Sequence, residues 1–215
     1  MSNQNIYRIF EVVSAVFELL PFVIVFIVIK KIKQYCIPLI VVVCLGIVTE
    51  VTNYICSNNG INNYFILRIY TIVELVLISL FYVLFFRKHF KSNFLFIPIP
   101  SFCVVAFIDY KINGINNFDN YAAAFEALTF SIFSLWSFFF ISKNLIFEKI
   151  TLEPFFWINT AVLFYFGGNL VLFIFNDYLI AHESSNHIAL WAIHSVLNIF
   201  YNILIAIGFW KTKRQ

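Results

Sequence analysis

Ionisable and amide side chains occur inside stretches of this sequence that are otherwise almost entirely apolar. Carboxylates, an imidazole and amides in such positions can hold protons, cations or small polar ligands, because hydrocarbon offers them no competing water. The candidate ligand-binding residues of this kind are Glu18, Glu50, Asn53, Arg68, Glu74, Glu126, Asn169, His194 and Asn198.

The charges within this set do not balance. Four glutamates meet one arginine and one histidine, so complete internal pairing is impossible. Burying an ionised group in a membrane costs about 2.5 to 3.5 kcal/mol on insertion scales, so either some glutamates are protonated or the site admits water or a cation. We expect Arg68 to pair with one of the glutamates. The alternative is that these residues only hold helices together through hydrogen bonds.

Seven apolar stretches position these residues. A helix needs roughly 20 apolar residues to cross a membrane, and runs of about that length are separated by charged or Asn-rich breaks. The fourth is the shortest, and we expect Pro98 and Pro100 to distort its first half. The stretches cover residues 7–29, 35–56, 64–86, 94–110, 121–142, 155–176 and 188–210.

The basic residues indicate an orientation. Eleven of the fourteen Lys and Arg residues follow the first, third, fifth or seventh stretch, and cytoplasmic loops carry the excess of these residues. The sequence therefore predicts an external N-terminus and a cytoplasmic C-terminus. In this orientation Glu50, Arg68, Glu126, Asn169 and His194 lie roughly 7 to 10 Å below the outer helix ends, at 1.5 Å per residue. Glu18 and Glu74 lie nearer the midplane, at about 15 Å.

Spacings of three and four residues place several polar residues on shared helix faces. His194, Asn198 and Asn202 follow this rhythm in the seventh stretch, as Asn159, Asn169 and Asn176 do in the sixth. The pattern predicts a helical bundle with a polar pocket in its outer half and a Phe-rich lipid surface.

The composition excludes several classes of protein. Hydrophobic residues make up 62% of the 215 residues and charged residues 12%, whereas soluble domains have about 25% charged residues. A soluble enzyme, a nucleic-acid binder and a secreted disulfide-stapled domain are therefore excluded. The predicted fold class is all-α, a polytopic membrane protein with seven transmembrane helices. We expect residues 1–215 to form a single transmembrane domain without a soluble domain, because the connections are short.

A weak internal repeat accompanies this architecture. The phrase FELLPF at 17–22 resembles FEALTF at 125–130, and Pro38 precedes Asn53 by the same interval as Pro154 precedes Asn169. These matches are consistent with two parallel three-helix units around a linking fourth helix, as in some transporters, although chance produces such matches about as often.

Three longer phrases carry a family resemblance. IYTIVELVLISLFY at 69–82, FWINTAVLFYFGGNLVLFIF at 156–175 and LWAIHSVLNIFYNILIAIGFW at 190–210 resemble those of an uncharacterised family of bacterial seven-helix membrane proteins. The genes of that family often neighbour those of sensor histidine kinases. The resemblance implies a bacterial inner-membrane location and a signalling partner such as a histidine kinase, and it assigns no activity to any residue.

We therefore expect a non-enzymatic inner-membrane sensor or ligand-binding protein, surrounded by lipid, with a small ligand, cation or proton in the polar pocket. The closest alternative is a small-solute transporter, a cation- or proton-coupled transporter, or a channel. It is less favoured because a pore needs polar groups along its whole length and the inner half is almost wholly apolar. An intramembrane enzyme is the third alternative, since no nucleophile, base and orienting group share one depth. No residue pattern predicts a cofactor or a metal site.

Overall fold

The chain folds into long α-helices, with no strand among the residues that the computed structural model describes, 3–89, 91–115, 117–182 and 184–214. Seven helices in these ranges are long and apolar enough to cross a membrane, so the all-α polytopic fold is confirmed. They are α1 (Asn3–Val28), α2 (Ile37–Asn58), α3 (Tyr64–Phe86), α4 (Pro98–Asn113), α5 (Asn120–Lys143), α6 (Pro154–His182) and α7 (Ser184–Lys211).

Proline and glycine fix several helix ends. Pro38, Pro98 and Pro154 lie in the first turns of α2, α4 and α6, where the missing N–H has no intrahelical partner to lose. Gly114 ends α4 with a φ of 71°, a left-handed conformation that suits a residue without a Cβ.

The fourth span begins at Phe94, as predicted. Its first residues belong to the 3-10 helix Ser92–Phe96, and the α-helix itself begins at Pro98. One predicted boundary was wrong. The loop expected between the sixth and seventh stretches is largely helical, since α6 continues to His182 and α7 begins at Ser184. In the sequence, the polar residues near these helix ends were interpreted as a loop.

The chain divides into two compact units. Unit 1 comprises residues 1–32 and 127–215, and unit 2 comprises residues 33–126. The boundary falls within α5, whose first turns belong to unit 2 and whose remainder belongs to unit 1. The single domain over residues 1–215 stays a prediction.

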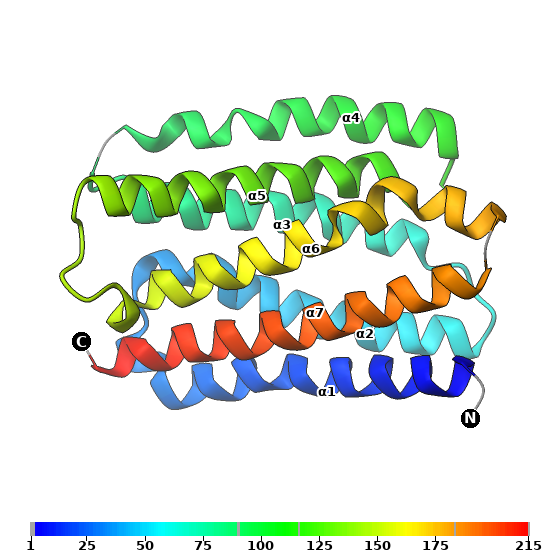
Figure 1. Ribbon diagram of the computed structural model, residues 1–215, viewed down its shortest axis with the longest axis horizontal. Coiled ribbons are helices and arrows are strands. Elements are labelled where there is room, and N and C mark those ends of the chain that lie inside the picture. The colour runs from blue at the N-terminus through cyan, green and yellow to red at the C-terminus, as the bar shows by residue number, and fades with distance from the viewer. Residues whose placement is uncertain (1–2, 90, 116, 183, 215) are drawn as a thin grey trace. The chain divides into compact units, whose positions relative to one another are not determined.

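In unit 1, α7 packs against both α1 and α6. Figure 1 shows α1 and α7 running in the same direction, with α6 antiparallel beside α7. Ser134 of α5 and Asn159 of α6 exchange two hydrogen bonds: the Ser134 hydroxyl donates to the Asn159 carbonyl at 3.2 Å, and the Asn159 amide donates to the Ser134 carbonyl at 3.0 Å. Both side chains are fully buried, so this pair fastens α5 to α6.

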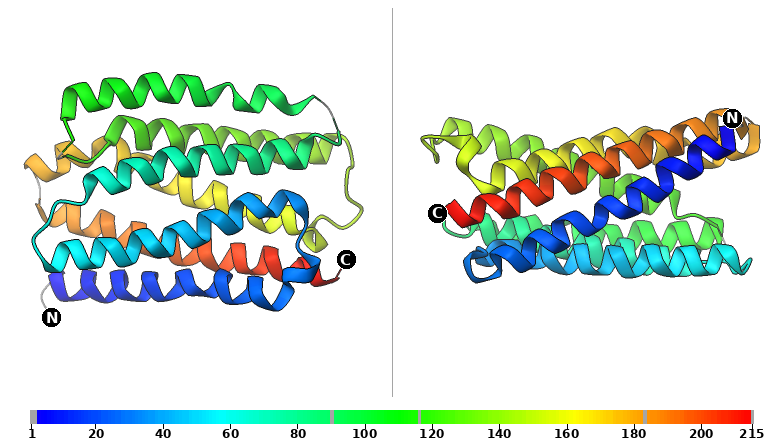
Figure 2. Two further views of the ribbon diagram at one scale, coloured as in Figure 1. Left: turned by 180° about the vertical axis from the view of Figure 1, so that it is seen from behind. Right: turned by 90° about the horizontal axis from the view of Figure 1, so that it is seen from below.

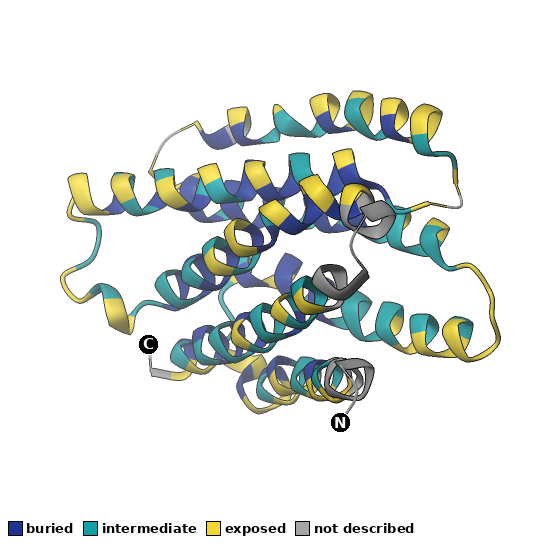
Figure 3. Ribbon diagram, turned by 45° about the vertical axis from the view of Figure 1, so that its right-hand side comes forward, coloured by how far each residue is buried: buried dark blue, intermediate teal, exposed yellow. Residues whose placement is uncertain are grey.

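In unit 2, α2 and α3 pack as antiparallel neighbours (Figure 2). The buried side of α3 includes Leu75, Ile78, Phe81 and Phe86, all without exposed surface. Exposed apolar positions recur along all seven helices (Figure 3). Such surfaces are stable against lipid and not against water, so the chain is a multi-pass membrane protein.

Candidate functional site

An ion pair in unit 2 joins α3 to α4. Arg68 Nη2 lies 3.2 Å from Asp109 Oδ1, and the Asp109 side chain has no exposed surface. The sequence had predicted a glutamate as the partner of Arg68, and this was wrong. Asp109 lies near the end of the fourth predicted stretch, and the set of candidate residues did not include it.

Asp109 also caps the N-terminus of α5. Its Oδ2 accepts hydrogen bonds from the backbone amides of Tyr121 at 2.7 Å and Ala122 at 3.2 Å. These are two of the N–H groups that a helix leaves without an intrahelical partner, and a carboxylate there is favoured by the helix dipole. Asn113 donates to Oδ1 at 3.2 Å. Asp109 is thus a structural residue with both oxygens bonded.

Arg68 holds the connection between α4 and α5 as well. Its Nη2 donates to the carbonyls of Gly114 at 2.9 Å and Asn117 at 3.1 Å. The guanidinium charge is therefore matched by Asp109 and further solvated by two backbone carbonyls.

Three further carboxylates of unit 2 lie near one another, and we call Glu74, Asp119 and Glu126 the acidic cluster. All three are buried, at 8%, 3% and 4% exposure. Glu126 is close enough to Glu74 and Asp119 for electrostatic repulsion from both. Glu74 Oε1 accepts a hydrogen bond from the Tyr70 hydroxyl at 3.1 Å. Glu126 Oε1 is buried and has no hydrogen-bond partner within the described ranges.

Asp119 lies just before α5, outside the helices that could span a membrane. Burial raises the pKa of its carboxyl above the ordinary 3.8, an effect that Arg68 opposes and Asp109 reinforces. The next residue, Asn120, is 4% exposed, and neither its amide oxygen nor its amide nitrogen has a hydrogen-bond partner in the described part of the chain. Unsatisfied buried groups of this kind are rare and require an explanation.

No group of three or more His, Cys, Asp or Glu side chains in the described part of the chain is arranged to hold a metal ion. Within the same residues, Arg68 is the one cation that acts on Asp119. Since Asp109 already matches the charge of Arg68, the acidic cluster carries excess negative charge when all its members are ionised.

A second polar network lies in unit 1, between α1 and α7. The Asn198 amide nitrogen donates to Ser14 Oγ and Glu18 Oε1, each at 2.9 Å. The Asn198 oxygen accepts from Asn202 Nδ2 at 3.2 Å, which fixes the orientation of the amide. The predicted residues Glu18 and Asn198 are thus in direct contact.

His194 joins α7 to α6 one turn earlier. Its Nδ1 lies 3.1 Å from Asn169 Oδ1, and Asn169 Nδ2 donates to the Tyr165 carbonyl at 2.9 Å. Because the Asn169 oxygen can only accept, His194 Nδ1 carries the proton in this bond. The rings of Tyr165, Phe173 and Trp191 surround the imidazole at centroid distances of 5.8, 6.2 and 5.0 Å.

The nine predicted residues therefore belong to both units. In unit 2, Glu74 and Glu126 lie near each other, whereas Arg68 pairs with Asp109. In unit 1, Asn169 contacts His194 and Glu18 contacts Asn198. In α2, Asn53 accepts a hydrogen bond from Asn63 at 2.9 Å, and Glu50 is half-buried. A pocket shared by all nine stays a prediction.

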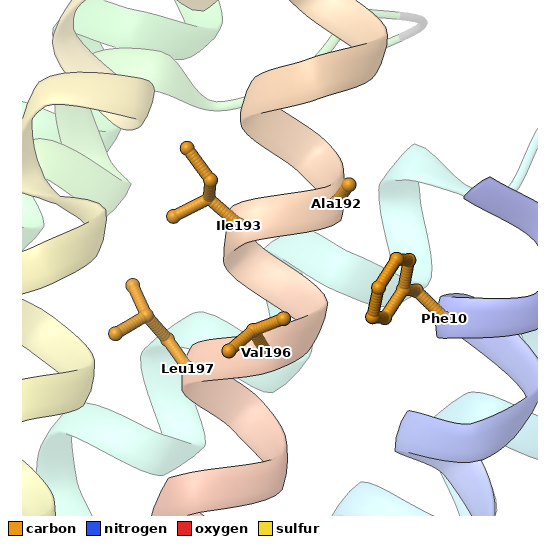
Figure 4. Close-up of a pocket in the computed structure, with 5 residues that line it drawn as sticks. All are labelled: Phe10, Ala192, Ile193, Val196 and Leu197. Carbon is orange, nitrogen blue, oxygen red and sulfur yellow. The ribbon is translucent and has the colours of Figure 1, made fainter. Parts of the chain in front are cut away.

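A cavity of about 270 Å³ lies between α1 and α7. Figure 4 shows the residues that line it, Phe10 from α1 and Ala192, Ile193, Val196 and Leu197 from α7. The lining is entirely apolar, and none of the predicted ligand-binding residues belongs to it. This cavity is therefore not the polar pocket that the sequence predicted.

Sequence reasoning missed Asp109, Asp119 and Asn120. Asp109 lies inside the fourth apolar stretch and could have been found by extending the search for ionisable residues to its last turn. Asp119 and Asn120 were assigned to a turn-rich break, and their burial depends on how the chain folds back between α4 and α5.

Comparison of the chain with protein-family models, curated proteins and solved structures finds no match.

Proposed function

We propose that the chain is a non-enzymatic proton sensor of the bacterial inner membrane, with the acidic cluster as its proton-binding site and a cytoplasmic signalling partner. One observation carries the proposal. Glu74, Asp119 and Glu126 are buried together, Glu126 Oε1 has no hydrogen-bond partner among the residues that the structure describes, and Arg68 is already ion-paired to Asp109. Two neighbouring carboxyl groups that share one proton remove part of the repulsion without any further ligand.

The donor set favours a proton over a divalent metal. A metal ion requires several oxygen, nitrogen or sulfur ligands in a defined geometry, and no such group occurs within the described residues. A proton requires only one oxygen atom with a free lone pair, which Glu126 Oε1 supplies.

If the N-terminus is external, as the distribution of basic residues predicts, this site lies in the outer half of the membrane. Asp119 then lies at its outer edge, where external water reaches first, and Glu74 lies about ten residues into α3. The site would therefore respond to the external pH and not to that of the cytoplasm.

The interior of α3 supports a sensor over a transporter. Beyond Glu74, the buried side chains of this helix are Leu75, Ile78, Phe81, Val83, Phe85 and Phe86, with Ser79 and Tyr82 as the polar ones. A transport path would need polar groups along its whole length, and beyond Glu74 α3 offers only these two buried hydroxyls. The partner class, a sensor histidine kinase, follows from the family resemblance alone.

The test uses purified full-length protein in lipid nanodiscs. Infrared difference spectra between about pH 5 and pH 8 report protonated carboxyl groups directly, and we compare wild type with Glu126→Gln and Glu74→Gln. The matched control is Glu148→Gln, which removes a carboxylate from the exposed connection after α5. We expect the band of the buried protonated carboxyl to be lost or shifted in Glu126→Gln and Glu74→Gln and unchanged in the control. Identical spectra for wild type, Glu126→Gln and Glu74→Gln would contradict the proposal.

A further inference from the structure

The parallel helices α1 and α7 of unit 1 end beside each other, and each is followed by lysine residues. After α1, residues Ile29–Lys31 form a 3-10 helix, and after α7, residues Thr212–Arg214 form another. The Lys31 ammonium donates to the carbonyl of Lys213 at 3.3 Å, which ties the two ends to each other. We call Lys30, Lys31, Lys211 and Lys213 the lysine bracket.

Tryptophan side chains lie beneath two of these ammonium groups. Lys213 Nζ is 4.8 Å from the centre of the Trp210 ring, and Lys211 Nζ is 5.9 Å from that of Trp157. Trp157 is itself held by a hydrogen bond from Nε1 to the carbonyl of Thr151 at 2.9 Å. Indole rings prefer the boundary between hydrocarbon and water, so the ammonium groups lie at the level of the lipid headgroups.

The chain segments that carry the bracket, α1 after Glu18 and the whole of α7, contain no acidic residue. Residues 19–32 and 184–215 contain no Asp or Glu. The neighbouring connection from α5 to α6 contributes Lys143 and Lys149 together with Glu148 and Glu153, which cancel in formal charge. Each helix C-terminus adds only about half a negative charge, so the four lysines leave a net positive surface.

From these contacts we infer that the lysine bracket binds the phosphodiester headgroup of an anionic phospholipid. Lys31 keeps two ammonium protons free after its bond to Lys213, and Lys30 and Lys213 are exposed. The surface beside them is apolar, with Phe26 and Ile29 exposed at 62% and 58%, which suits acyl chains attached to the same headgroup. A soluble phosphate shares the headgroup chemistry but gains nothing from this apolar surface.

The test measures lipid binding to the full-length protein in detergent by native mass spectrometry, with phosphatidylglycerol, phosphatidylcholine and glycerol 3-phosphate as separate probes. The variant is Lys31→Gln/Lys213→Gln. The matched control is Lys88→Gln/Lys91→Gln, which removes two exposed lysines from the connection after α3. Thermal midpoints without lipid establish that both variants are folded.

We expect wild type to bind phosphatidylglycerol more tightly than phosphatidylcholine. Loss of two lysines near a membrane surface corresponds to a weakening of roughly 30-fold, and we expect this for Lys31→Gln/Lys213→Gln but not for the control. Equal weakening in both variants, or equal affinity for the two lipids, would overturn the inference. Binding of glycerol 3-phosphate as tight as that of phosphatidylglycerol would also overturn it, because the site would then recognise soluble phosphate.

Discussion

Asp109 illustrates what a single residue contributes to this protein. It accepts hydrogen bonds from α3, from α4 and from the start of α5, and so it leaves Arg68 without excess charge for the glutamates. Counting ionisable residues in the sequence had shown that carboxylates outnumber cations. It could not show which carboxylate takes the arginine, because that depends on the direction in which the α4–α5 connection folds.

Asp119 should make the stability of the protein depend on pH. Burial raises the pKa of this carboxyl in the folded state above its ordinary 3.8, so the folded protein holds a proton that the unfolded chain has already released. The free energy of unfolding should therefore fall as pH rises through the interval between the two pKa values, and stay lower above it. The variant Asp119→Asn has no carboxyl group at this position, so its free energy of unfolding lacks this dependence on pH.

We expect the thermal midpoint of Asp119→Asn to exceed that of wild type at neutral pH and to approach it near pH 3. The charged groups that act on Asp119 are Arg68 of α3, Asp109 of α4 and Glu126 of α5. Midpoints measured at half-unit intervals test this, with Glu148→Gln as a control that keeps the wild-type curve. Parallel curves for wild type and Asp119→Asn would show that burial of this carboxyl has no energetic effect.

At the scale of helices, close packing in unit 1 depends on two glycines. A Cβ on Gly168 of α6 would lie 2.6 Å from Leu197 Cδ1, and a Cβ on Gly208 of α7 would lie 2.6 Å from Ile158 Cγ1 and 3.2 Å from the carbonyl of Pro154. Small residues that allow such approach are typical of membrane helix interfaces. The neighbouring Gly167 is different, since its nearest atom is Ser131 Oγ at 3.5 Å.

Alanine substitutions should therefore destabilise in a defined order. Gly208→Ala meets backbone as well as side chain and should lower stability most, Gly168→Ala should cost about 1 to 3 kcal/mol, and Gly167→Ala should be neutral or slightly stabilising. Leu197 also lines the apolar cavity and has room to move, which keeps the cost of Gly168→Ala near the lower end. Thermal midpoints of the purified variants measure the order.

The double variant Gly168→Ala/Leu197→Ala tests the cause. It should lose less stability than the sum of its single substitutions, because removing the leucine side chain removes the clash. Additive losses would mean that Gly168 matters for some reason other than contact with Leu197.

The sequence was most informative about the helices themselves. Length and hydropathy located seven of them because a membrane imposes both. Helix ends were less predictable, since the continuation of α6 and α7 into polar residues follows no hydrophobic signal. The pairs Glu18 with Asn198 and Asn169 with His194 required the packing of α7 between α1 and α6, which periodicity within one helix does not specify.

At the scale of the whole molecule, the distribution of lysine and arginine predicts how the chain crosses the membrane. Reporter fusions that are active only on one side of the membrane test this orientation. We expect fusions at Lys33, Lys91 and Gln215 to report a cytoplasmic position, and fusions at Asn59, Asn116 and Ser184 an external one. Free-standing reporter expressed at the same level serves as the control. A reversed pattern would move the acidic cluster to the cytoplasmic half and redirect the proposed sensor to internal pH.

The hydrogen bond between Glu18 and Asn198 joins residues 180 positions apart, and this separation has a consequence for synthesis. At about 5 to 20 residues per second, the ribosome takes roughly 9 to 36 s to reach Asn198 after it has translated Glu18. During that time α1 has left the ribosome, but α7, which carries the hydrogen-bond donor Asn198, has not yet been synthesised. The first helix therefore has to accommodate Glu18 without Asn198 until the last helix arrives.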